Sequence, residues 1–220
     1  MLKINPAESE SNSLHLRSDL HLLRKTWHIF TGLSGLNLHF QSNLAPQFTA
    51  NVLFTVAVLG FLVDISRMYS EQLNHIVMRT MGPFMRESEK KSFSGFPFYA
   101  LGVALSLTLY QEKLAILAIL FLIFSDPISA VFGVIFGKDK ILPNKSLQGA
   151  TAGFVTCYFL ALFYGLLYLR PSFDLLSFSL FAGFVGMVSE LASGKIDDNL
   201  TIPLISGGGL TLLNLFVPLY

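Results

Sequence analysis

Residues 113–137 read KLAILAILFLIFSDPISAVFGVIFG, and this stretch decides the fold. Its length and apolar character fit one helix across the roughly 30 Å hydrocarbon layer of a membrane. A carboxylate, Asp126, lies in its middle and is followed by Pro127. An ionisable group at membrane depth is costly unless it faces a polar cavity or a partner, so Asp126 predicts a functional site. Because Pro127 removes a backbone donor, we expect a broken helix that lines a cavity open to the cytosol.

The composition of the whole chain agrees with a membrane protein. Apolar residues make up 52% of the 220 residues and charged residues only 13%, which excludes an ordinary soluble domain. The alternating pattern of a transmembrane barrel is missing, and a net charge of +1 gives no indication of a nucleic-acid partner. We therefore predict an all-α, polytopic integral membrane helix bundle with about seven transmembrane helices. The expected spans are residues 27–44, 46–63, 94–111, 113–137, 147–169, 173–193 and 199–219.

The positions of the basic residues predict the orientation of the bundle. If all seven spans cross, one side of the membrane receives 13 of the 15 Lys and Arg residues. The positive-inside rule then places the N-terminus in the cytosol and the C-terminus outside. The alternative, an interfacial helix at 27–44, would move four basic residues to the wrong side. The polar residues 1–20 predict a disordered cytosolic tail, and residues 21–220 a single transmembrane catalytic domain.

Small residues share helix faces with the acidic residues of the spans. Gly133 follows Asp126 at helical spacing, and Gly186 precedes Glu190 by one turn. Small residues allow close helix packing in lipid, so these faces should point into the bundle. Close packing with the polar groups as glue is the alternative to a functional site. In the last span, Gly207–Gly209 predict an irregular segment.

Basic residues beside the spans indicate phosphate binding. Lys145 and Ser146 precede Gly149 where a span begins, and a lysine beside a helix amino terminus favours phosphate. Arg24 and Lys25 precede the first span. Taken singly, each basic residue is explained equally well as a topology signal. Together with acidic groups able to hold a divalent ion, they predict a nucleotide or another phosphorylated compound with Mg²⁺ as one partner and a second substrate that enters from the membrane.

Other classes of site are not indicated. The sequence contains no Walker glycine loop and no protein-kinase signature set. The five histidines form no HExxH arrangement, so a catalytic zinc is not expected. The single Cys157 rules out an intramolecular disulfide and is expected to be a small core residue.

Several short motifs occur along residues 20–219 in an order and spacing that are specific as a set. They are Arg24-Lys25-Thr26-Trp27-His28 with Gly32; Asp64-Ile65-Ser66-Arg67; Arg86-Glu87 with Gly95; Asp126-Pro127-Ile128-Ser129-Ala130 with Gly133 and Gly137; Lys145-Ser146-Leu147-Gln148-Gly149; and Glu190 followed by Asp197-Asp198-Asn199-Leu200-Thr201-Ile202-Pro203. On these motifs the chain resembles the polyprenol and phytol kinase family, which includes dolichol kinases and CTP-dependent diacylglycerol kinases. Gln148 departs from the pattern, since the family often has Glu there.

The resemblance implies a membrane enzyme that transfers a phosphoryl group from a nucleotide, typically CTP, to the hydroxyl of a lipid alcohol. A polyprenol, phytol and diacylglycerol are all candidate acceptors, and the reaction is expected at the cytosolic face. The implied catalytic residues, of which the three aspartates would act through Mg²⁺, are Asp126, Asp197, Asp198, Asn199 and Glu190. The implied nucleotide-binding residues are Arg24, Lys25, His28, Lys145, Ser146 and Gly149.

Two other functions stay open at this point. CDP-diacylglycerol synthases, which are lipid cytidylyltransferases, also use CTP with Mg²⁺, but residues 196–203 lack their longer terminal motif. A transporter would also explain buried carboxylates. The expected partners are the nucleotide, the lipid alcohol and the membrane, with a homodimer as an open alternative and no nucleic acid. We expect a multi-pass protein of the cytoplasmic membrane in a bacterium or of the endoplasmic reticulum in a eukaryote.

Overall fold

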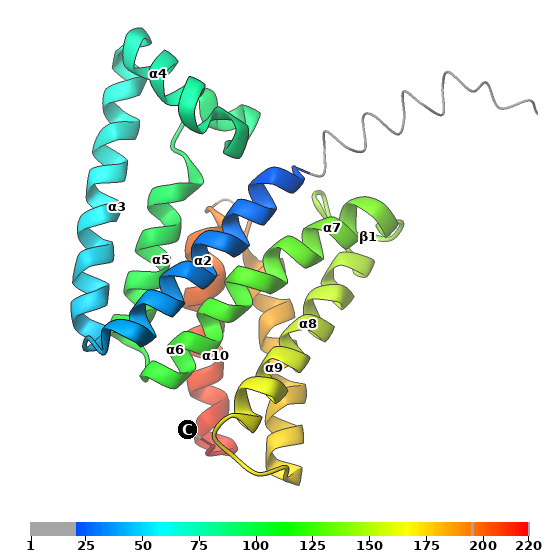
Figure 1. Ribbon diagram of the computed structural model, residues 1–220. Coiled ribbons are helices and arrows are strands. Elements are labelled where there is room, and N and C mark those ends of the chain that lie inside the picture. Colours follow the sequence, from blue (N-terminus) through cyan, green and yellow to red (C-terminus); the bar gives the residue numbers. More distant parts are fainter. Residues whose placement is uncertain (1–20, 195, 220) are drawn as a thin grey trace, which may run out of the picture.

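The computed structural model describes residues 21–194 and 196–219 (Figure 1). The tail predicted at residues 1–20 lies outside the described residues. The helical elements are α2 (Leu22–Ser42), α3 (Pro46–Tyr69), α4 (Glu71–Met81), η1 (Gly82–Phe84), η2 (Glu87–Lys91), α5 (Gly95–Leu109), α6 (Glu112–Leu120), the π-helical turn η3 (Phe121–Ser125), α7 (Asp126–Phe136), α8 (Leu147–Leu166), α9 (Phe173–Ala192) and α10 (Asp198–Phe216). One antiparallel hairpin joins β1 (Lys140–Leu142) to β2 (Lys145–Ser146).

A helix occupies each of the seven predicted spans, with ends that differ by a few residues, so the all-α bundle is confirmed. Five helical segments are long and apolar enough to cross a membrane: α3, the continuous segment Glu112–Phe136, α8, α9 and α10. The apolar helix α5 has only 15 residues, and α2 is interrupted by polar side chains. The count of seven crossings and the direction of the bundle therefore remain predictions.

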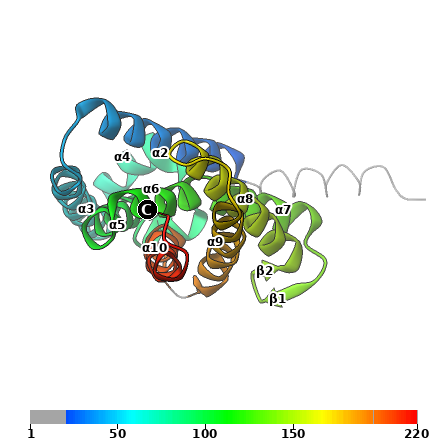
Figure 2. The same ribbon diagram turned by 90° about the horizontal axis from the view of Figure 1, so that it is seen from below.

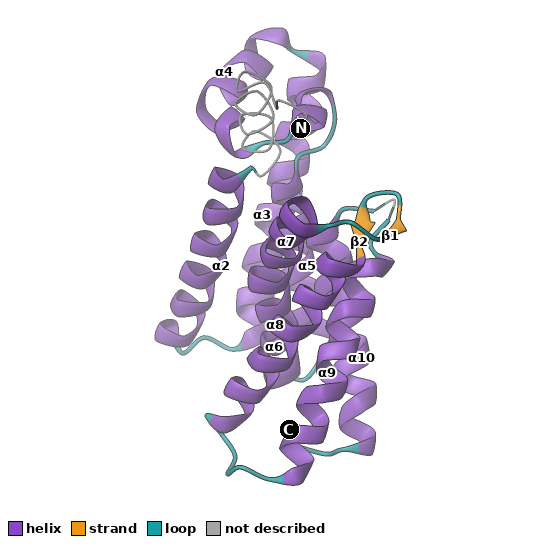
Figure 3. Ribbon diagram, turned by 90° about the vertical axis from the view of Figure 1, so that its right-hand side faces the viewer, coloured by secondary structure: helices purple, strands orange, loops and turns teal. Residues whose placement is uncertain are grey.

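The long loops gather at one end of the molecule. Helix α4, the β1–β2 hairpin and the start of α2 lie at this end, and the C-terminus lies at the opposite end (Figure 3). Lys145 of the hairpin contacts the end of α9 and the start of α10. The connection from α9 to α10 therefore lies at the same end of the molecule as the hairpin. We call this end the loop end. The loop end contains the segments that the positive-inside rule predicts to face the cytosol.

The segment Glu112–Phe136 is the central helix of the bundle, and it is the most deeply buried of the five candidate spans. Seen along the bundle, α6 lies inside a ring formed by the other helices (Figure 2). Phe121 of this segment packs with Cys157 and Phe178 in the main hydrophobic core. Cys157 is thus the buried core residue that the sequence predicts.

The central helix is continuous where the sequence predicts a break. Instead, the π-helical turn Phe121–Ser125 widens the helix directly before Asp126 and Pro127. A proline has no N–H to donate and its ring clashes with the carbonyl of the residue four positions earlier, which is Ile123 here. A π-helical turn relieves both problems without interrupting the helix.

The prediction of an irregular segment at Gly207–Gly209 is wrong, because α10 is helical throughout this region. These glycines serve close packing instead. A side chain at Gly207 would collide with the ring of Tyr110, and one at Gly209 would lie 2.6 Å from a methyl carbon of Val185. The last helix therefore approaches α9 and the end of α5 more closely than any larger residue would allow.

Helices α2 and α3 lie at one side of this packed bundle (Figures 1 and 2). Helix α3 packs along α5, whereas α2 contacts the bundle mainly at η1, η3 and α7. The outward faces of both helices carry exposed apolar side chains such as Phe30 and Leu62. Such faces suit the hydrocarbon of a membrane.

Candidate active site

A lysine at the loop end binds carboxylates from two different helices. Lys145 Nζ lies 2.8 Å from Glu190 Oε1 on α9 and 3.8 Å from Asp198 Oδ2 at the start of α10. It also donates to Ser193 Oγ at 3.5 Å. The β1–β2 hairpin ends at Ser146, whose hydroxyl caps α8 by accepting from the Gly149 amide. The turn thus holds Lys145 over the gap between α9 and α10.

The charge of Lys145 is maintained by its acidic neighbours. Burial has the largest single effect and lowers the pKa of this lysine, but the nearby carboxylates of Asp198 and Glu190 more than offset it. The net result is a pKa raised above the ordinary value for lysine. The ammonium group therefore stays protonated at physiological pH and remains available to a phosphate.

Asp126 joins this cluster from the central helix. It interacts electrostatically with Asp198, Lys145 and Glu190. Three of the residues predicted as catalytic therefore come together around the predicted lysine, from three separate helices. We call Asp126, Lys145, Glu190 and Asp198 the acidic cluster.

Asp197 lies at the edge of this group and already has partners. Its Oδ1 atom caps α10 by accepting from the amide of Asn199, and its Oδ2 atom lies 3.4 Å from Arg86 Nη1. The side chain therefore fixes the start of the helix that carries Asp198. Arg86 also interacts electrostatically with Asp126, so this arginine brings a second positive charge to the cluster.

The acidic cluster offers the type of donor that Mg²⁺ prefers. Within residues 21–194 and 196–219, no group of three or more His, Cys, Asp or Glu residues is arranged closely enough to hold a metal ion. However, Glu190 Oε2 is buried and lacks any hydrogen-bond partner among the described residues. Carboxylate oxygens are hard ligands suited to Mg²⁺, and a buried oxygen without a partner favours a cation. By the type of their donor atoms, Asp126, Glu190 and Asp198 thus fit such an ion.

A second polar group lies next to the cluster and contains two predicted residues. Arg24 Nη1 donates to both carboxylate oxygens of Glu89, at 2.8 and 3.0 Å. Asn199 Nδ2 donates to the carbonyl of Gly95 at 3.1 Å. A side chain at Gly95 would lie 2.6 Å from Arg24 Nη2 and 2.7 Å from Asn199 Nδ2, so only glycine leaves room for both. Asn199 links this group to the adjacent Asp198.

The remaining predicted nucleotide-binding residues are divided among three places. Lys25 is half-buried and interacts electrostatically with Asp126, which puts it near the acidic cluster. His28 bonds to the carbonyl of Leu122 in the π-helical turn at 3.1 Å. Ser146 and Gly149 are buried where α7 meets α8. Their local roles are to cap and pack this helix start.

The motif residues Asp64 and Arg67, to which the sequence assigns no role, hold the loop between α4 and α5. Arg67 is fully buried, pairs with Asp64 at 2.6 Å and donates to the carbonyls of Glu89 and Ser92. Asp64 in turn accepts from the amide and hydroxyl of Ser94. Glu89 was not distinguishable from Glu87 in a charged stretch that also resembles a solvated loop helix. Only the fold reveals that Glu89 faces inward.

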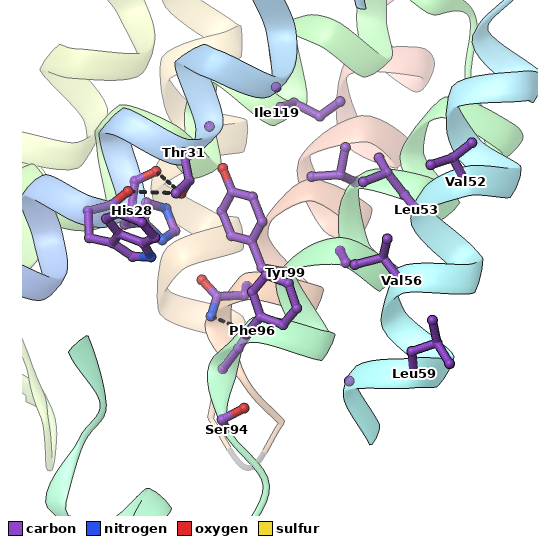
Figure 4. A pocket seen from close by; sticks show the side chains of 18 of the residues that line it. His28, Thr31, Val52, Leu53, Val56, Leu59, Ser94, Phe96, Tyr99 and Ile119 are labelled. Carbon is purple, nitrogen blue, oxygen red and sulfur yellow. Dashed lines mark hydrogen bonds between the residues drawn. The ribbon is translucent and has the colours of Figure 1, made fainter. Parts of the chain in front are cut away.

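A cavity of about 830 Å³ opens beside this second polar group (Figure 4). It lies between α2, α3 and α5, and Arg24, Glu89 and Asn199 line its polar end. Most of the remaining lining is apolar and includes Val52, Val56 and other α3 side chains. This cavity was not predictable from the sequence, because its lining combines α2, α3 and α5 with Asn199 of α10 through tertiary packing.

Comparisons with known proteins identify the family. The model of the cytidylyltransferase family matches residues 16–196, and this match ends directly before Asp197. CTP-dependent diacylglycerol kinase 1 of Schizosaccharomyces pombe is 31% identical over 205 residues, which cover 86% of this chain and 92% of that protein. The protein of the same name in Saccharomyces cerevisiae is 28% identical over 208 residues, which cover 83% of this chain and 70% of that protein.

A bacterial relative extends the comparison. An uncharacterised protein of Rickettsia prowazekii is 29% identical over 191 residues, which cover 84% of this chain and 91% of that protein. No solved structure matches significantly. The predicted resemblance to CTP-dependent lipid kinases is thus confirmed, and it favours a transferase over a transporter. The chain belongs to the cytidylyltransferase family and, within it, to the group of CTP-dependent lipid kinases.

Proposed function

We propose that this protein is a membrane-embedded kinase that transfers the terminal phosphoryl group of CTP to the hydroxyl of a lipid alcohol. The names of the two yeast relatives make diacylglycerol the first acceptor to test, with phytol and polyprenols after it. The observation that carries the proposal is the acidic cluster, which adjoins an apolar cavity through the neighbouring residues Asp198 and Asn199. A charged donor and an apolar acceptor could meet there.

In the proposed reaction, the lipid oxygen attacks the terminal phosphorus of CTP. A new O–P bond forms while the bond between that phosphorus and the bridging oxygen breaks, and CDP leaves. The proton of the lipid hydroxyl passes to a carboxylate, for which Asp126 and Asp198 are the candidates. Lys145 and Arg86 offset negative charge on the phosphoryl groups, since positioning and charge neutralisation supply most of the catalysis in such transfers.

Mg²⁺ would be held by the carboxylates of Asp126, Glu190 and Asp198, with Asp197 beside them. When bound, it would neutralise charge on the phosphate oxygens of CTP. Arg24 and Lys25, at the start of α2, would add positive charge on that side of the acidic cluster. His28, Ser146 and Gly149 would support the site through the π-helical turn and the start of α8. The cytosolic orientation and a homodimer remain expectations of this proposal.

The family description also supports a second candidate, a cytidylyltransferase that makes a CDP-lipid. A product assay with purified protein, Mg²⁺ and CTP distinguishes the two. The kinase yields CDP and a lipid monophosphate from diacylglycerol, whereas the cytidylyltransferase yields pyrophosphate and a CDP-lipid from phosphatidate. Formation of pyrophosphate without CDP would overturn the kinase assignment.

A further inference from the structure

We propose that the cavity between α2, α3 and α5 is the lipid site and that it is built for an ester lipid, diacylglycerol. This inference rests on the proposed kinase function and adds where the acceptor binds and what selects it. The hydroxyl would lie at the polar end beside Asn199, and an ester carbonyl would accept a hydrogen bond from Tyr99. The acyl chains would lie along α3.

The dimensions and lining of the cavity suit a lipid. Its lining follows α2 from Arg24 to Ser42, which corresponds to roughly 27 Å of helix. Along α3, its lining residues recur on one helical face: Val52, Val56, Leu59 and Val63. Because α2 is held mainly at η1, η3 and α7, the cavity lies behind a loosely packed wall. A lipid could enter there from the side, without crossing the aqueous phase.

The polar end of the cavity is continuous with the acidic cluster. Asn199 lines the cavity and directly follows Asp198, whose carboxylate lies 3.8 Å from Lys145 Nζ. Gly95 keeps this end narrow but open, since any side chain there would meet Arg24 and Asn199. A hydroxyl at this end would therefore reach the residues proposed to hold CTP.

An unpaired hydroxyl inside the bundle indicates which lipid fits. Tyr99 lines the cavity, and its Oη atom is buried without a hydrogen-bond partner among the described residues. In Figure 4 its ring extends from α5 toward the helix that carries Thr31. Burying a hydroxyl without a partner is unfavourable, so an acceptor from a ligand would be stabilising. Gly32 leaves the space for this hydroxyl, because a side chain there would collide with it.

The depth of Tyr99 favours diacylglycerol over a prenol. Tyr99 follows Gly95 by one turn of α5, or roughly 6 Å along the helix. Diacylglycerol carries ester carbonyls a few bonds below its free hydroxyl, whereas phytol and polyprenols carry no acceptor beyond the hydroxyl. A donor at this depth thus matches the ester lipid. Helix α2 covers the hydroxyl and would shift slightly as the lipid binds.

The only tryptophan of the chain provides a direct binding signal. Trp27 lines the cavity near its polar end and packs against the ring of Phe84. Its fluorescence in the purified full-length protein can be titrated with diacylglycerol brominated on its acyl chains. We expect saturable quenching that unlabelled diacylglycerol reverses. Linear, non-saturable quenching would reflect partitioning into the detergent micelle only and would overturn the proposal.

Two matched substitutions on α3 locate the bound lipid. Val56 lines the cavity, whereas Val58 is an exposed residue of the same helix outside the cavity. Val56→Phe should weaken lipid binding by at least about tenfold, and Val58→Phe should leave it unchanged. Equal effects of the two variants would contradict the assignment. If Val56→Phe instead dissociated a dimer without changing the quenching, the cavity would belong to a second copy of the chain.

The selectivity claim has its own test. Tyr99→Phe should weaken binding of diacylglycerol by about three- to tenfold and leave binding of brominated phytol unchanged. An equal loss for both lipids would mean that Tyr99 has a structural role only and would overturn the proposed selectivity for diacylglycerol.

Product assays distinguish failure of the lipid-site proposal from failure of the kinase proposal. If phosphatidate forms without saturable quenching, only the proposed lipid site is overturned. If quenching is saturable but no CDP is released, only the proposed kinase function is overturned.

Discussion

Two groups of buried charges lie at the loop end, and they differ in how completely they are paired. Arg67 donates from all of its side-chain nitrogens, and both oxygens of Asp64 accept. In the acidic cluster, by contrast, Glu190 Oε2 has no partner among the described residues, and Asp198 lies 3.8 Å from Lys145. Fully paired charges hold a structure together, whereas incompletely paired ones remain available to a ligand. The comparison therefore distinguishes charges that are paired within the fold from charges that remain available to a ligand.

The largest effect should come from breaking the fully paired group. Arg67→Met leaves the buried carboxylate of Asp64 without its cation, and such a loss costs about 3–5 kcal/mol of folding free energy. Denaturant or thermal unfolding of the purified protein in detergent would measure it. Lys90→Met is the control, since Lys90 pairs with Glu87 at the surface and should change stability by less than about 1 kcal/mol. Similar losses in the two variants would refute the structural role of Arg67.

Removing one charge of the acidic cluster should lower turnover rather than stability. We expect Asp198→Asn to lower kcat by about 10²–10³-fold, the usual cost of one electrostatic group at a reacting centre. The unfolding transition should stay close to that of the unmodified chain, because the carboxylate is partly exposed. Asp139→Asn, at the same end but bonded to Gln148, should keep kcat within about twofold. Normal turnover of Asp198→Asn would remove this residue from the reaction.

Lys145 is expected to act through CTP binding. Lys145→Ala should raise the KM for CTP by about 10–100-fold, which corresponds to the loss of one charged hydrogen bond. It also leaves Glu190 buried without a cation, so the variant should be less stable. Combining it with Glu190→Gln should recover stability but not the KM. An unchanged KM for CTP in a folded variant would argue against phosphate binding by Lys145.

Much of the helix arrangement was predictable from sequence because it depends on apolar length alone. The seven expected spans coincide with helices, and Asp126 was identified by a charge within an apolar run. The π-helical turn was not predictable, because several backbone adjustments can accommodate Pro127. The helical course of Gly207–Gly209 was missed for a related reason. A glycine signals either an irregular backbone or close packing, and only its neighbours decide which.

The candidate site was predictable in its charges but not in its pairing. The sequence identified Lys145, Glu190 and Asp198 as site residues, and the fold brings them together. It did not reveal that Glu89 pairs with Arg24, because pairing across 65 residues depends on tertiary contacts. The cavity was missed for the same reason. The family resemblance supplied the expected roles of the residues, and the structure supplied the distances between them.

The smallest expected effect concerns the close contact between α5 and α10, which positions Asn199 next to the acidic cluster. Gly102 of α5 packs against the first turn of α10, where a side chain would collide with the Asn199 carbonyl and lie 3.1 Å from Leu200 Cα. Gly102→Ala should therefore cost about 1–3 kcal/mol of stability and raise the KM for the lipid through displacement of Asn199.

Gly35 provides the matched control for this prediction. A side chain there meets nothing within 4 Å, and the residue lies inside helix α2. Gly35→Ala should therefore leave stability unchanged or raise it by up to about 1 kcal/mol, because alanine favours the helix. Unfolding in detergent compares the two variants. If Gly102→Ala were as stable as Gly35→Ala, the close contact between α5 and α10 would not be what positions Asn199.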